Sequence, residues 1–446
     1  MRKPIQYLAA AVSAGLLLTG CAFGPPKEPG GITMLDSTGN VLVSGADATS
    51  LSAHQNWAYL EQAAYEGAKI LEEKLALSWE DAQQALFSGS YTLHTALDPT
   101  VCQCLQDVLQ NNENTAAVAG AITDLQGRLL ALYSTRDGDT NHATQTKQPC
   151  SAFKSLSVYT PALEAGKISW VSQVEDSPYL QIDGKDWPQN NSGIYAKKNV
   201  MVYDAIRKSL NTVAVKVLAD VGVEESIAFL QDSFGMTLGR EAALAKEKGG
   251  DEVIGNVALG SLEVGVSPMD MAGYYQIFAN GGKYQKPAAV LEVTDTDGNT
   301  IYTRSDQAKR VVKAETADLM NRLLQGVVTV GATGEEAAVP GVPIAGKTGT
   351  GNEGSDNWFV GVTGAYSCAI WHGQNQNNRA DVLFSQVTKA IYELAPQTEK
   401  VFLTHGNMRS ALYCTQSGKA AGKSCPSVGN GYFAGLEPLP ACDIHQ

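Results

Sequence analysis

The chain has 446 residues, of which 44% are hydrophobic and 18% are charged. This composition gives enough apolar surface for two or three domains, and it excludes a disordered, collagen-like or coiled-coil protein. The formal net charge of −13 and the pI near 5.0 argue against a nucleic-acid partner, because an acidic surface repels phosphates.

The N-terminus has the features of an export signal. Arg2 and Lys3 precede an apolar stretch over residues 7–18, which is too short for a membrane-spanning helix but suits a signal-peptide core. The sequence Leu18-Thr19-Gly20-Cys21 resembles the bacterial lipoprotein box, in which cleavage leaves a lipid-modified cysteine. We therefore expect a signal peptide over residues 1–20, lipidation at Cys21, and a location at the extracytoplasmic face of the bacterial cell membrane.

Two short segments follow the predicted cleavage site. Gly and Pro residues favour a flexible, lipid-anchored stalk over residues 21–49. Residues 50–90 have helical spacing, with Ser78 placed as an N-cap before two acidic residues, so we expect a short helical lead-in.

From Tyr91 onward the pattern becomes one of hairpins around a helical block. Turn signals between apolar runs predict hairpins over residues 117–135, 290–304 and 358–371. A long Ala-rich helical stretch lies between the first two hairpins, over residues 151–278. This order favours an α+β fold, in which helices flank an antiparallel sheet whose strands come from both halves of the chain.

The ends of this domain are set by composition. We place it over residues 91–403, with a final strand or helix near residues 383–394. The Gly-, Ser- and Pro-rich tail over residues 404–446 contains three cysteines, and we expect it to be an extended appendage.

Cys102 and Cys104 lie on a helical stretch, where positions i and i+2 do not face each other, so we expect no metal site and no cofactor.

Three short motifs occur in an order that indicates acyl-transfer chemistry. They are Ser151-Ala152-Phe153-Lys154, Ser209-Leu210-Asn211 and Lys347-Thr348-Gly349-Thr350. Each is weak alone, but their order and their spacings of 58 and 138 residues (209 − 151 and 347 − 209) match the catalytic set of serine β-lactamases and penicillin-binding proteins.

The residue types in the first and third motifs explain how a serine could become a nucleophile. On a helix, Lys154 lies on the same face as Ser151 and can act as the base that removes the hydroxyl proton. Lys154 can do so only when it is neutral, which requires burial or a neighbouring cation. Lys347 is the candidate cation.

The remaining motif residues have predicted roles in proton transfer and substrate binding. Ser209 would relay a proton to the leaving amine, and Asn211 would hydrogen-bond the backbone amide of the substrate. Gly349 would let an acyl-peptide add as a strand beside residues 344–350. The backbone N–H groups of Ser151 and Thr350 would form an oxyanion hole. The hydroxyls of Thr348 and Thr350 suit a substrate carboxylate.

Each motif also has a purely structural interpretation. Ser151 and Asn211 could cap helices, and the Lys347 motif could be an ordinary strand end. Two further sequence patterns carry less weight. Ser355-Asp356-Asn357 spells a β-lactamase motif but in the wrong order, so we expect it to begin a strand, and Glu252 has the spacing of a deacylating glutamate without the flanking Leu.

With these residues in place, the chain from Tyr91 onward resembles the transpeptidase domain of class A penicillin-binding proteins. The resemblance rests on the motifs above and on further runs, which are Thr95-Ala96-Leu97-Asp98-Pro99, Ala162-Leu163-Glu164-x-Gly166, Trp187-x-x-Asn190, Leu259-Gly260-Ser261-x-Glu263-Val264-x-Val266-Ser267-Pro268, Phe278-Ala279-Asn280-Gly281-Gly282 and Asp356-x-Trp358-Phe359-Val360-Gly361. The tail, with Cys414, Cys425, Cys442 and His445, is similar to tails of Gram-positive members.

The resemblance implies the β-lactamase/DD-peptidase fold, with an all-helical subdomain and the site at its seam with the sheet. It implies a D,D-transpeptidase that cross-links the cell wall through a Ser151 acyl-enzyme, with D,D-carboxypeptidase activity where water is the acceptor. The implied partners are peptidoglycan stem peptides, β-lactam antibiotics and, through the lipid anchor, the membrane.

Three departures from the family pattern qualify this expectation. Cys150 stands where members usually have Gly, and Ser155 stands where they usually have Pro, which affects the fine geometry of the active helix. The first 90 residues are too few for the usual glycosyltransferase domain, so we expect a separate glycosyltransferase to polymerise glycan. The open alternatives are a β-lactamase that uses Glu252, and a penicillin-sensing or peptidoglycan-binding lipoprotein without turnover.

Overall fold

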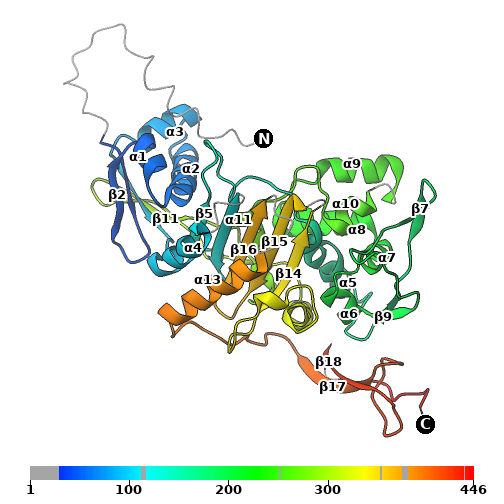
Figure 1. The fold of residues 1–446 in the computed structure, drawn as a ribbon. Coiled ribbons are helices and arrows are strands. Elements are labelled where there is room, and N and C mark those ends of the chain that lie inside the picture. The colour runs from blue at the N-terminus through cyan, green and yellow to red at the C-terminus, as the bar shows by residue number, and fades with distance from the viewer. Residues whose placement is uncertain are drawn as a thin grey trace, which may run out of the picture.

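The computed structural model is a mixed α+β protein, which confirms the predicted class (Figure 1). A central sheet lies between a smaller N-terminal sheet and a region of helices, and a C-terminal hairpin projects from the body (Figure 1). The structure describes residues 30–111, 117–250, 253–351, 354–373, 380–435 and 437–445.

The central sheet is antiparallel throughout, with the strand order β14-β15-β16-β4-β5. Its strands are β4 (Val118–Asp124), β5 (Leu129–Ser134), β14 (Ala345–Thr350), β15 (Asp356–Val362) and β16 (Tyr366–Gly373). The hairpins predicted over residues 117–135 and 358–371 are confirmed, and the sheet does join strands from both halves of the chain. Strand β14 forms one edge of this sheet.

Helices cover both faces of the central sheet. On one face, Phe359 of β15 packs on Phe384 of α13 (Ala380–Leu394), with ring centroids 4.7 Å apart. On the other face, the hydroxyl of Thr123 in β4 donates to the carbonyl of Ala272 in α11 (Pro268–Tyr275) at 3.5 Å. Because neither face meets water, β4 and β16 are buried along their whole length.

A second five-stranded sheet forms the N-terminal part of the molecule, in the order β12-β11-β3-β1-β2. Its strands are β1 (Ile32–Leu35), β2 (Val41–Ala46), β3 (Tyr91–Thr95), β11 (Val290–Asp295) and β12 (Thr300–Thr303). The hairpin predicted over residues 290–304 is confirmed and belongs to this sheet. All of its pairings are antiparallel except that of β1 with β3, which is parallel.

The stalk predicted over residues 21–49 is wrong for residues 32–46, which form β1 and β2; the part of it up to residue 29 lies outside the described residues. The Asp36 carboxylate closes the turn between these strands, accepting from the backbone N–H groups of Thr38 and Asn40 at 2.8 and 2.9 Å. Composition missed this hairpin because β1 is short and finds its partner β3 only after the helical lead-in.

The predicted helical lead-in is confirmed as α1 (Ala48–Ala53), α2 (Trp57–Lys74) and α3 (Trp79–Leu86). Ser78 caps α3 as expected, accepting from the Asp81 backbone N–H at 3.1 Å. The buried Glu66 carboxylate of α2 accepts from the backbone N–H groups of Ala289 and Val290 at 2.7 and 3.0 Å. These bonds dock the lead-in on the second sheet.

The long block between β5 and β11 is mostly helical, as predicted. Its helices are η2 (Cys150–Phe153), the π-helix η3 (Ser155–Tyr159), α5 (Thr160–Glu164), α6 (Val202–Arg207), α7 (Asn211–Val221), α8 (Val223–Phe234), α9 (Gly239–Lys248), α10 (Ile254–Leu259), α11 and η5 (Gln276–Phe278). The expectation of an all-helical subdomain needs one correction. Two short antiparallel ribbons interrupt it, β6 (Gln173–Glu175) with β9 (Asn199–Met201) and β7 (Leu180–Ile182) with β8 (Lys185–Trp187).

The remaining elements complete the body and the tail. They are α4 (Pro99–Gln110), β10 (Lys283–Tyr284), β13 (Lys309–Arg310), α12 (Ala314–Gln325), η6 (Gly326–Val328), η7 (Glu335–Ala337), β17 (Met408–Cys414) and β18 (Val428–Ala434). Helix α13 occupies the position predicted for a final strand or helix. The tail forms an antiparallel hairpin of β17 and β18 beyond the body (Figure 1).

Candidate active site

The three predicted motifs meet where the edge strand β14 adjoins the helical region. Lys154 directly follows η2, Ser209 lies two residues before the start of α7, and Lys347 lies on β14. These residues come from segments 55 and 138 residues apart, yet their polar atoms share one hydrogen-bonded cluster. The fold therefore brings the predicted catalytic side chains together.

The Ser209 hydroxyl lies between the two lysine amines. Lys347 Nζ donates to Ser209 Oγ at 2.8 Å, and Lys154 Nζ lies 3.5 Å from the same oxygen and 2.9 Å from the Ser209 carbonyl. Ser209 adopts a positive φ of 54°, which a serine seldom takes and which must be held by its surroundings. A hydroxyl between two amines can pass a proton between them, which is the predicted relay.

Burial sets the charge state of the two lysines, both of which have no solvent exposure. Burial and the nearby Lys347 hold the pKa of Lys154 well below its usual range. Burial lowers the pKa of Lys347 to about 7. The arrangement favours a neutral Lys154 beside a Lys347 that carries its charge up to neutral pH, which is the base and cation pair predicted from the sequence.

Ser151 lies on the η2 turn with its side chain partly exposed. The alternative that it merely caps a helix does not hold, because Pro149 is the residue before η2 and no side-chain cap bond is made there. Within the described part of the chain, the Ser151 hydroxyl has no hydrogen-bond partner, while the Lys154 backbone N–H donates to the Ser151 carbonyl. The serine is thus one turn from the buried amine and open to a substrate.

The backbone beside Ser151 shows what one departure from the family pattern involves. Cys150 has a positive φ of 50°, a conformation that favours glycine. Its backbone N–H donates to the carbonyl of Gly260 at 3.1 Å, and a Cβ on Gly260 would lie 2.2 Å from the Cys150 carbonyl oxygen. The Leu259-Gly260-Ser261 run therefore holds the turn that presents Ser151. Burial raises the pKa of the Cys150 thiol to about 12, so this neighbour remains a neutral thiol.

Strand β14 lies against the η2 turn that carries Ser151. A Cβ at Gly349 would come within 2.7 Å of the Pro149 carbonyl oxygen, so only glycine allows this approach. β14 pairs with β15 on one side only and is the sheet edge, which suits the predicted addition of a peptide strand. The Thr348 hydroxyl lies 3.4 Å from Lys347 Nζ and donates to the Thr333 hydroxyl at 3.0 Å.

Asn211 has a positioning contact that the sequence did not predict. Its Oδ1 accepts from Lys154 Nζ at 2.5 Å, and its Nδ2 donates to the Gln189 carbonyl at 2.7 Å. The backbone N–H of Asn211 donates to Asn190 Oδ1 at 2.9 Å, so Asn211 begins α7 rather than capping it with its side chain. The carboxamide has a second N–H for the expected substrate contact.

Sequence reasoning missed the residues that hold Asn211 in place. The Asn190 side chain is 4% exposed and donates through Nδ2 to Asp176 Oδ1 at 2.8 Å. Asp176 also accepts from the Thr212 hydroxyl at 2.7 Å. The run Trp187-x-x-Asn190 marked this asparagine as part of the family pattern, but only the fold assigns it the task of holding Asn211.

Several other sequence predictions fall elsewhere. Ser355-Asp356-Asn357 begins β15 as expected, with Asp356 accepting from the Trp371 indole at 2.8 Å. Glu252 and Cys21 lie outside the described residues. Among the helices of the described residues, none combines the length and apolar character needed to cross a membrane.

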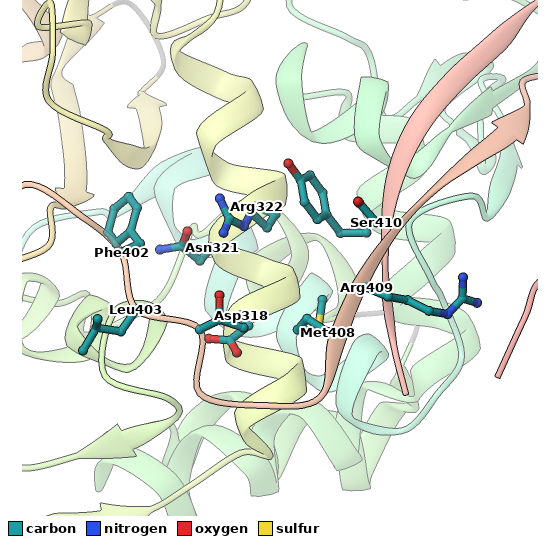
Figure 2. A pocket seen from close by; sticks show the side chains of 10 residues that line it. Asp318, Asn321, Arg322, Phe402, Leu403, Met408, Arg409 and Ser410 are labelled. Carbon is teal, nitrogen blue, oxygen red and sulfur yellow. The ribbon is translucent and has the colours of Figure 1, made fainter. Parts of the chain in front are cut away.

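Two cavities of the described structure do not coincide with this cluster. A cavity of about 190 Å³ lies between α12 and the tail hairpin, lined by residues that include Asn321, Phe402 and Ser410 (Figure 2). A second cavity of about 510 Å³ lies beside it, near residues 163–169 and 437–439. The cluster of Lys154, Ser209 and Lys347 instead lies beside β14, the edge strand of the central sheet.

Comparisons with known proteins agree with the geometry. Residues 117–388 match the family described as the penicillin binding protein transpeptidase domain. The chain is 31% identical over 363 residues to Penicillin-binding protein 1F of Bacillus subtilis (strain 168), covering 76% of this chain and 48% of that protein. It is 29% identical over 411 residues to Penicillin-binding protein 1A/1B of the same organism, covering 82% and 43%. The chain thus spans about half the length of these curated relatives.

Solved structures share the fold. The D,D-transpeptidase domain of a peptidoglycan glycosyltransferase from Eggerthella lenta matches with a TM-score of 0.62 at 20% identity, covering 82% of this chain and 98% of that chain. The PonA1 protein from Mycobacterium tuberculosis in complex with penicillin V matches with a TM-score of 0.64 at 21% identity, covering 86% and 98%. At these identities the likeness supports the fold alone.

Proposed function

The chain belongs to the penicillin-binding-protein transpeptidase family, and from this premise we propose that it is a serine D,D-transpeptidase acting on peptidoglycan stem peptides. The observation that carries the proposal is the buried Lys154–Ser209–Lys347 cluster one turn from the partly exposed Ser151. A protein that only binds peptide would gain nothing from burying two amines, because burial penalises their charged forms.

In the proposed acylation step, Ser151 attacks the carbonyl carbon of the penultimate D-Ala. The hydroxyl proton passes to the neutral Nζ of Lys154 as the Oγ–C bond forms, and the carbonyl oxygen becomes an oxyanion facing the backbone N–H groups of Ser151 and Thr350. The C–N bond then breaks, and the proton reaches the leaving amine of D-Ala through the Ser209 hydroxyl.

The remaining residues bind and orient the peptide. The substrate carboxylate lies toward the Lys347 ammonium and the hydroxyls of Thr348 and Thr350, while the peptide backbone adds to the edge of β14. In the second half-reaction, an acceptor amine or water gives a proton to Lys154 and attacks the acyl carbon. The bond from that carbon to Ser151 Oγ then breaks, and Lys154 returns the proton to Oγ, which regenerates the serine. An amine gives a cross-link and water gives a trimmed peptide. A β-lactam would acylate Ser151 by the same route, its ring amide replacing the D-Ala–D-Ala bond.

The proposal extends to location and partners. We propose that Cys21 carries lipid at the extracytoplasmic face of the membrane and that a separate glycosyltransferase supplies the glycan strands. The lipoprotein-box sequence supports the first of these points. A Cys21→Ala variant should appear in the soluble extracytoplasmic fraction rather than with the membrane, and membrane retention of that variant would contradict lipid anchoring.

A product assay tests the enzymatic proposal. The chain is incubated with a synthetic acyl-D-Ala-D-Ala peptide and an excess of another D-amino acid, with Ser151→Ala as the matched control. We expect Ser151-dependent release of D-Ala, with an exchanged peptide reporting transpeptidation and a shortened peptide reporting carboxypeptidation. A folded wild-type chain that releases no D-Ala would contradict the proposal and favour a binding protein.

A further inference from the structure

The tail hairpin gathers three cysteines and a histidine that the proposed reaction does not use. Cys414 ends β17, Cys425 lies in the connection to β18, and Cys442 and His445 lie in the last described segment. Their ligand atoms, three Sγ and one imidazole nitrogen, all lie within 4.8 Å of one another. These residues are separated in sequence by 10, 16 and 2 residues, so the fold alone brings them together.

The distances within the cluster fit ligands around a single ion. His445 Nδ1 lies 3.4 Å from the Sγ atoms of both Cys414 and Cys442. A sulfur at about 2.3 Å and a nitrogen at about 2.0 Å from one zinc ion would lie roughly 3.5 Å apart at a tetrahedral angle. All three cysteines have free thiols. A disulfide would use two of them and leave the third sulfur and the imidazole without a role.

The surroundings orient the histidine as they do in metal sites. The other ring nitrogen, His445 Nε2, lies 2.9 Å from Gln416 Oε1, which suits an N–H donated to a carbonyl oxygen. Such a bond places the lone pair on Nδ1, the atom that faces the sulfurs. Histidines that bind metals are usually held by a second bond of this kind.

Hydrogen bonds donated to the cysteine sulfurs also favour their thiolate form. The Ser417 hydroxyl donates to Cys442 Sγ at 3.3 Å, and the Gly422 backbone N–H lies 3.2 Å from Cys425 Sγ. Hydrogen bonds to sulfur stabilise its charged form, which is the form that binds a metal.

Few residues of the tail are buried. In the described part of residues 404–445, the buried residues are Tyr413, Cys414, Gly418, Gly431 and Phe433. An isolated two-stranded hairpin is marginal in water, and a short segment without its own core needs a cross-link, a metal or a partner. Two backbone hydrogen bonds place the last segment beside the connection between β17 and β18. The Ala420 N–H donates to the Pro440 carbonyl at 2.8 Å, and the Cys442 N–H donates to the Ala420 carbonyl at 3.0 Å. Water can compete for both bonds.

We propose that Cys414, Cys425, Cys442 and His445 bind one Zn²⁺ ion in a closed tetrahedral site that fixes the C-terminal segment to the β17–β18 hairpin. Four protein ligands leave no open position, which makes the site structural rather than catalytic. Three thiolates and an imidazole select zinc over magnesium or calcium, which prefer oxygen. This proposal departs from the expectation of no metal, which rested on the spacing of Cys102 and Cys104 and on the lack of a second CxxC or a His partner in the sequence.

Metal analysis of the full chain tests the proposal directly. The chain is purified with a thiol reductant, incubated with ZnCl₂, freed of excess metal, and its zinc is measured by mass spectrometry of the elements. We expect one zinc per chain, lost in Cys414→Ser and in His445→Ala and kept in the control Cys104→Ala, whose thiol is buried in α4 outside the cluster. With CoCl₂ instead, the visible spectrum should show a tetrahedral ion with thiolate charge transfer. Reduced wild-type chain that takes up no zinc, or equal loss in Cys104→Ala, would overturn the proposal.

A second variant keeps the test informative if loss of a ligand unfolds the tail. Gln416→Ala leaves all four ligands in place and removes only the acceptor for His445 Nε2–H. We expect its zinc to pass to a competing chelator at about 10- to 100-fold lower chelator concentration than in the wild type, as for other partners of metal-bound histidines. A further readout is limited proteolysis, in which chelation should expose residues 415–445 to cleavage while the body stays intact. A tail whose cleavage is indifferent to chelation would contradict the structural role.

Discussion

The active-site cluster of Lys154, Ser209 and Lys347, called the seam below, and the C-terminal tail are held together in opposite ways. In the seam, Lys154, Ser209 and Lys347 are almost completely buried, and each contacts residues from another element of the body. In the tail, the ligand cluster sits on a hairpin that reaches the body mainly through contacts such as Trp170 with Tyr432, whose rings lie 5.2 Å apart. The seam is organised by the core around it, whereas the tail needs a local cross-link.

The two regions also differ in the charged groups that they bring together. The seam places two amines where water cannot reach them, which lowers stability and holds the pKa of both amines below the usual lysine range. The tail would gather thiolates, whose mutual repulsion is relieved only by a cation. Variants in the seam should therefore change chemistry strongly, and changes in the tail should change local stability with little effect on chemistry.

The largest expected effect short of losing the nucleophile comes from Lys154→Met, which keeps most of the side-chain volume and removes the base. The rate constant for acylation by benzylpenicillin should fall by about 10²- to 10⁴-fold, the usual contribution of general-base catalysis. The matched control is Lys389→Met, whose side chain is 66% exposed on α13 and which should acylate at the wild-type rate. Equal rates for Lys154→Met and wild type, measured by stopped-flow or quenched labelling, would remove Lys154 from the mechanism.

The next effect tests whether Asn190 positions Asn211. Asn190→Ala removes the acceptor for the Asn211 backbone N–H and a donor to Asp176. The acylation rate should fall about 10- to 100-fold, because a small misplacement of a catalytic group costs that much. Chemical denaturation should show a loss of about 1–3 kcal/mol in the free energy of unfolding, the usual penalty for buried groups left unpaired.

A merely structural role for Asn190 can be distinguished from positioning. If the residue acts through Asn211 and Lys154, the pH profile of acylation in Asn190→Ala should shift along the pH axis. Unchanged kinetics in a destabilised variant would assign Asn190 to stability alone.

The pH dependence of acylation follows from the two lysines. Below its lowered folded-state pKa, Lys154 is protonated and cannot accept a proton, so the rate should rise with pH by up to about tenfold per pH unit on that limb. Lys347 loses its charge as the pH passes about 7, so binding of a carboxylate-bearing β-lactam should weaken above that pH. In Lys347→Arg, whose side chain stays charged, β-lactam binding should no longer weaken above that pH. If binding still weakens above that pH in this variant, another group is responsible.

A smaller effect concerns stability. Because the Lys347 pKa is lowered to about 7 in the folded state, the unfolded chain binds more protons between pH 7 and the usual lysine pKa. The free energy of unfolding should therefore rise with pH across this window, by at most about 1.4 kcal/mol per pH unit for each lysine. Lys347→Met should flatten this rise in urea titrations, and a wild-type slope in that variant would show that Lys347 is not the group responsible.

The smallest effect is expected from the tail. Removing the proposed zinc with a chelator should change the acylation rate by less than about twofold, because distant sites without shared partners behave independently. One of the contacts between the tail and the helical region is the Gln173 side chain, which donates to the Gln416 carbonyl at 3.0 Å. A large loss of acylation on chelation would show instead that the tail supports the active-site residues.

The sequence predicted the seam better than the tail for a physical reason. Ser151 and Lys154 are one helical turn apart, and Lys347 and Gly349 share a short strand, so local spacing reveals their relation. Asn190 and Thr333 were missed because they act through contacts that only the fold creates. The tail cysteines share no short spacing, and the His445 ring reaches Cys414 only after β17 and β18 pair.

The same distinction between local and long-range signals holds for the fold. Hairpins with two adjacent strands and a turn between them were correct, because each is defined within about 20 residues. The local sequence does not predict strands β1 and β2, because β1 pairs in parallel with β3, from which the whole helical lead-in separates it. Long-range pairing of short strands leaves little trace in the local sequence.

The most direct test of the central claim is intact mass spectrometry of the chain during incubation with benzylpenicillin, followed by peptide mapping. We predict one persistent adduct per chain, located on Ser151, absent in Ser151→Ala and formed slowly in Lys154→Met. Undiminished labelling of folded Ser151→Ala, or an adduct on another residue, would contradict the account. An adduct that clears while hydrolysed drug accumulates would also contradict it, since that behaviour belongs to a β-lactamase.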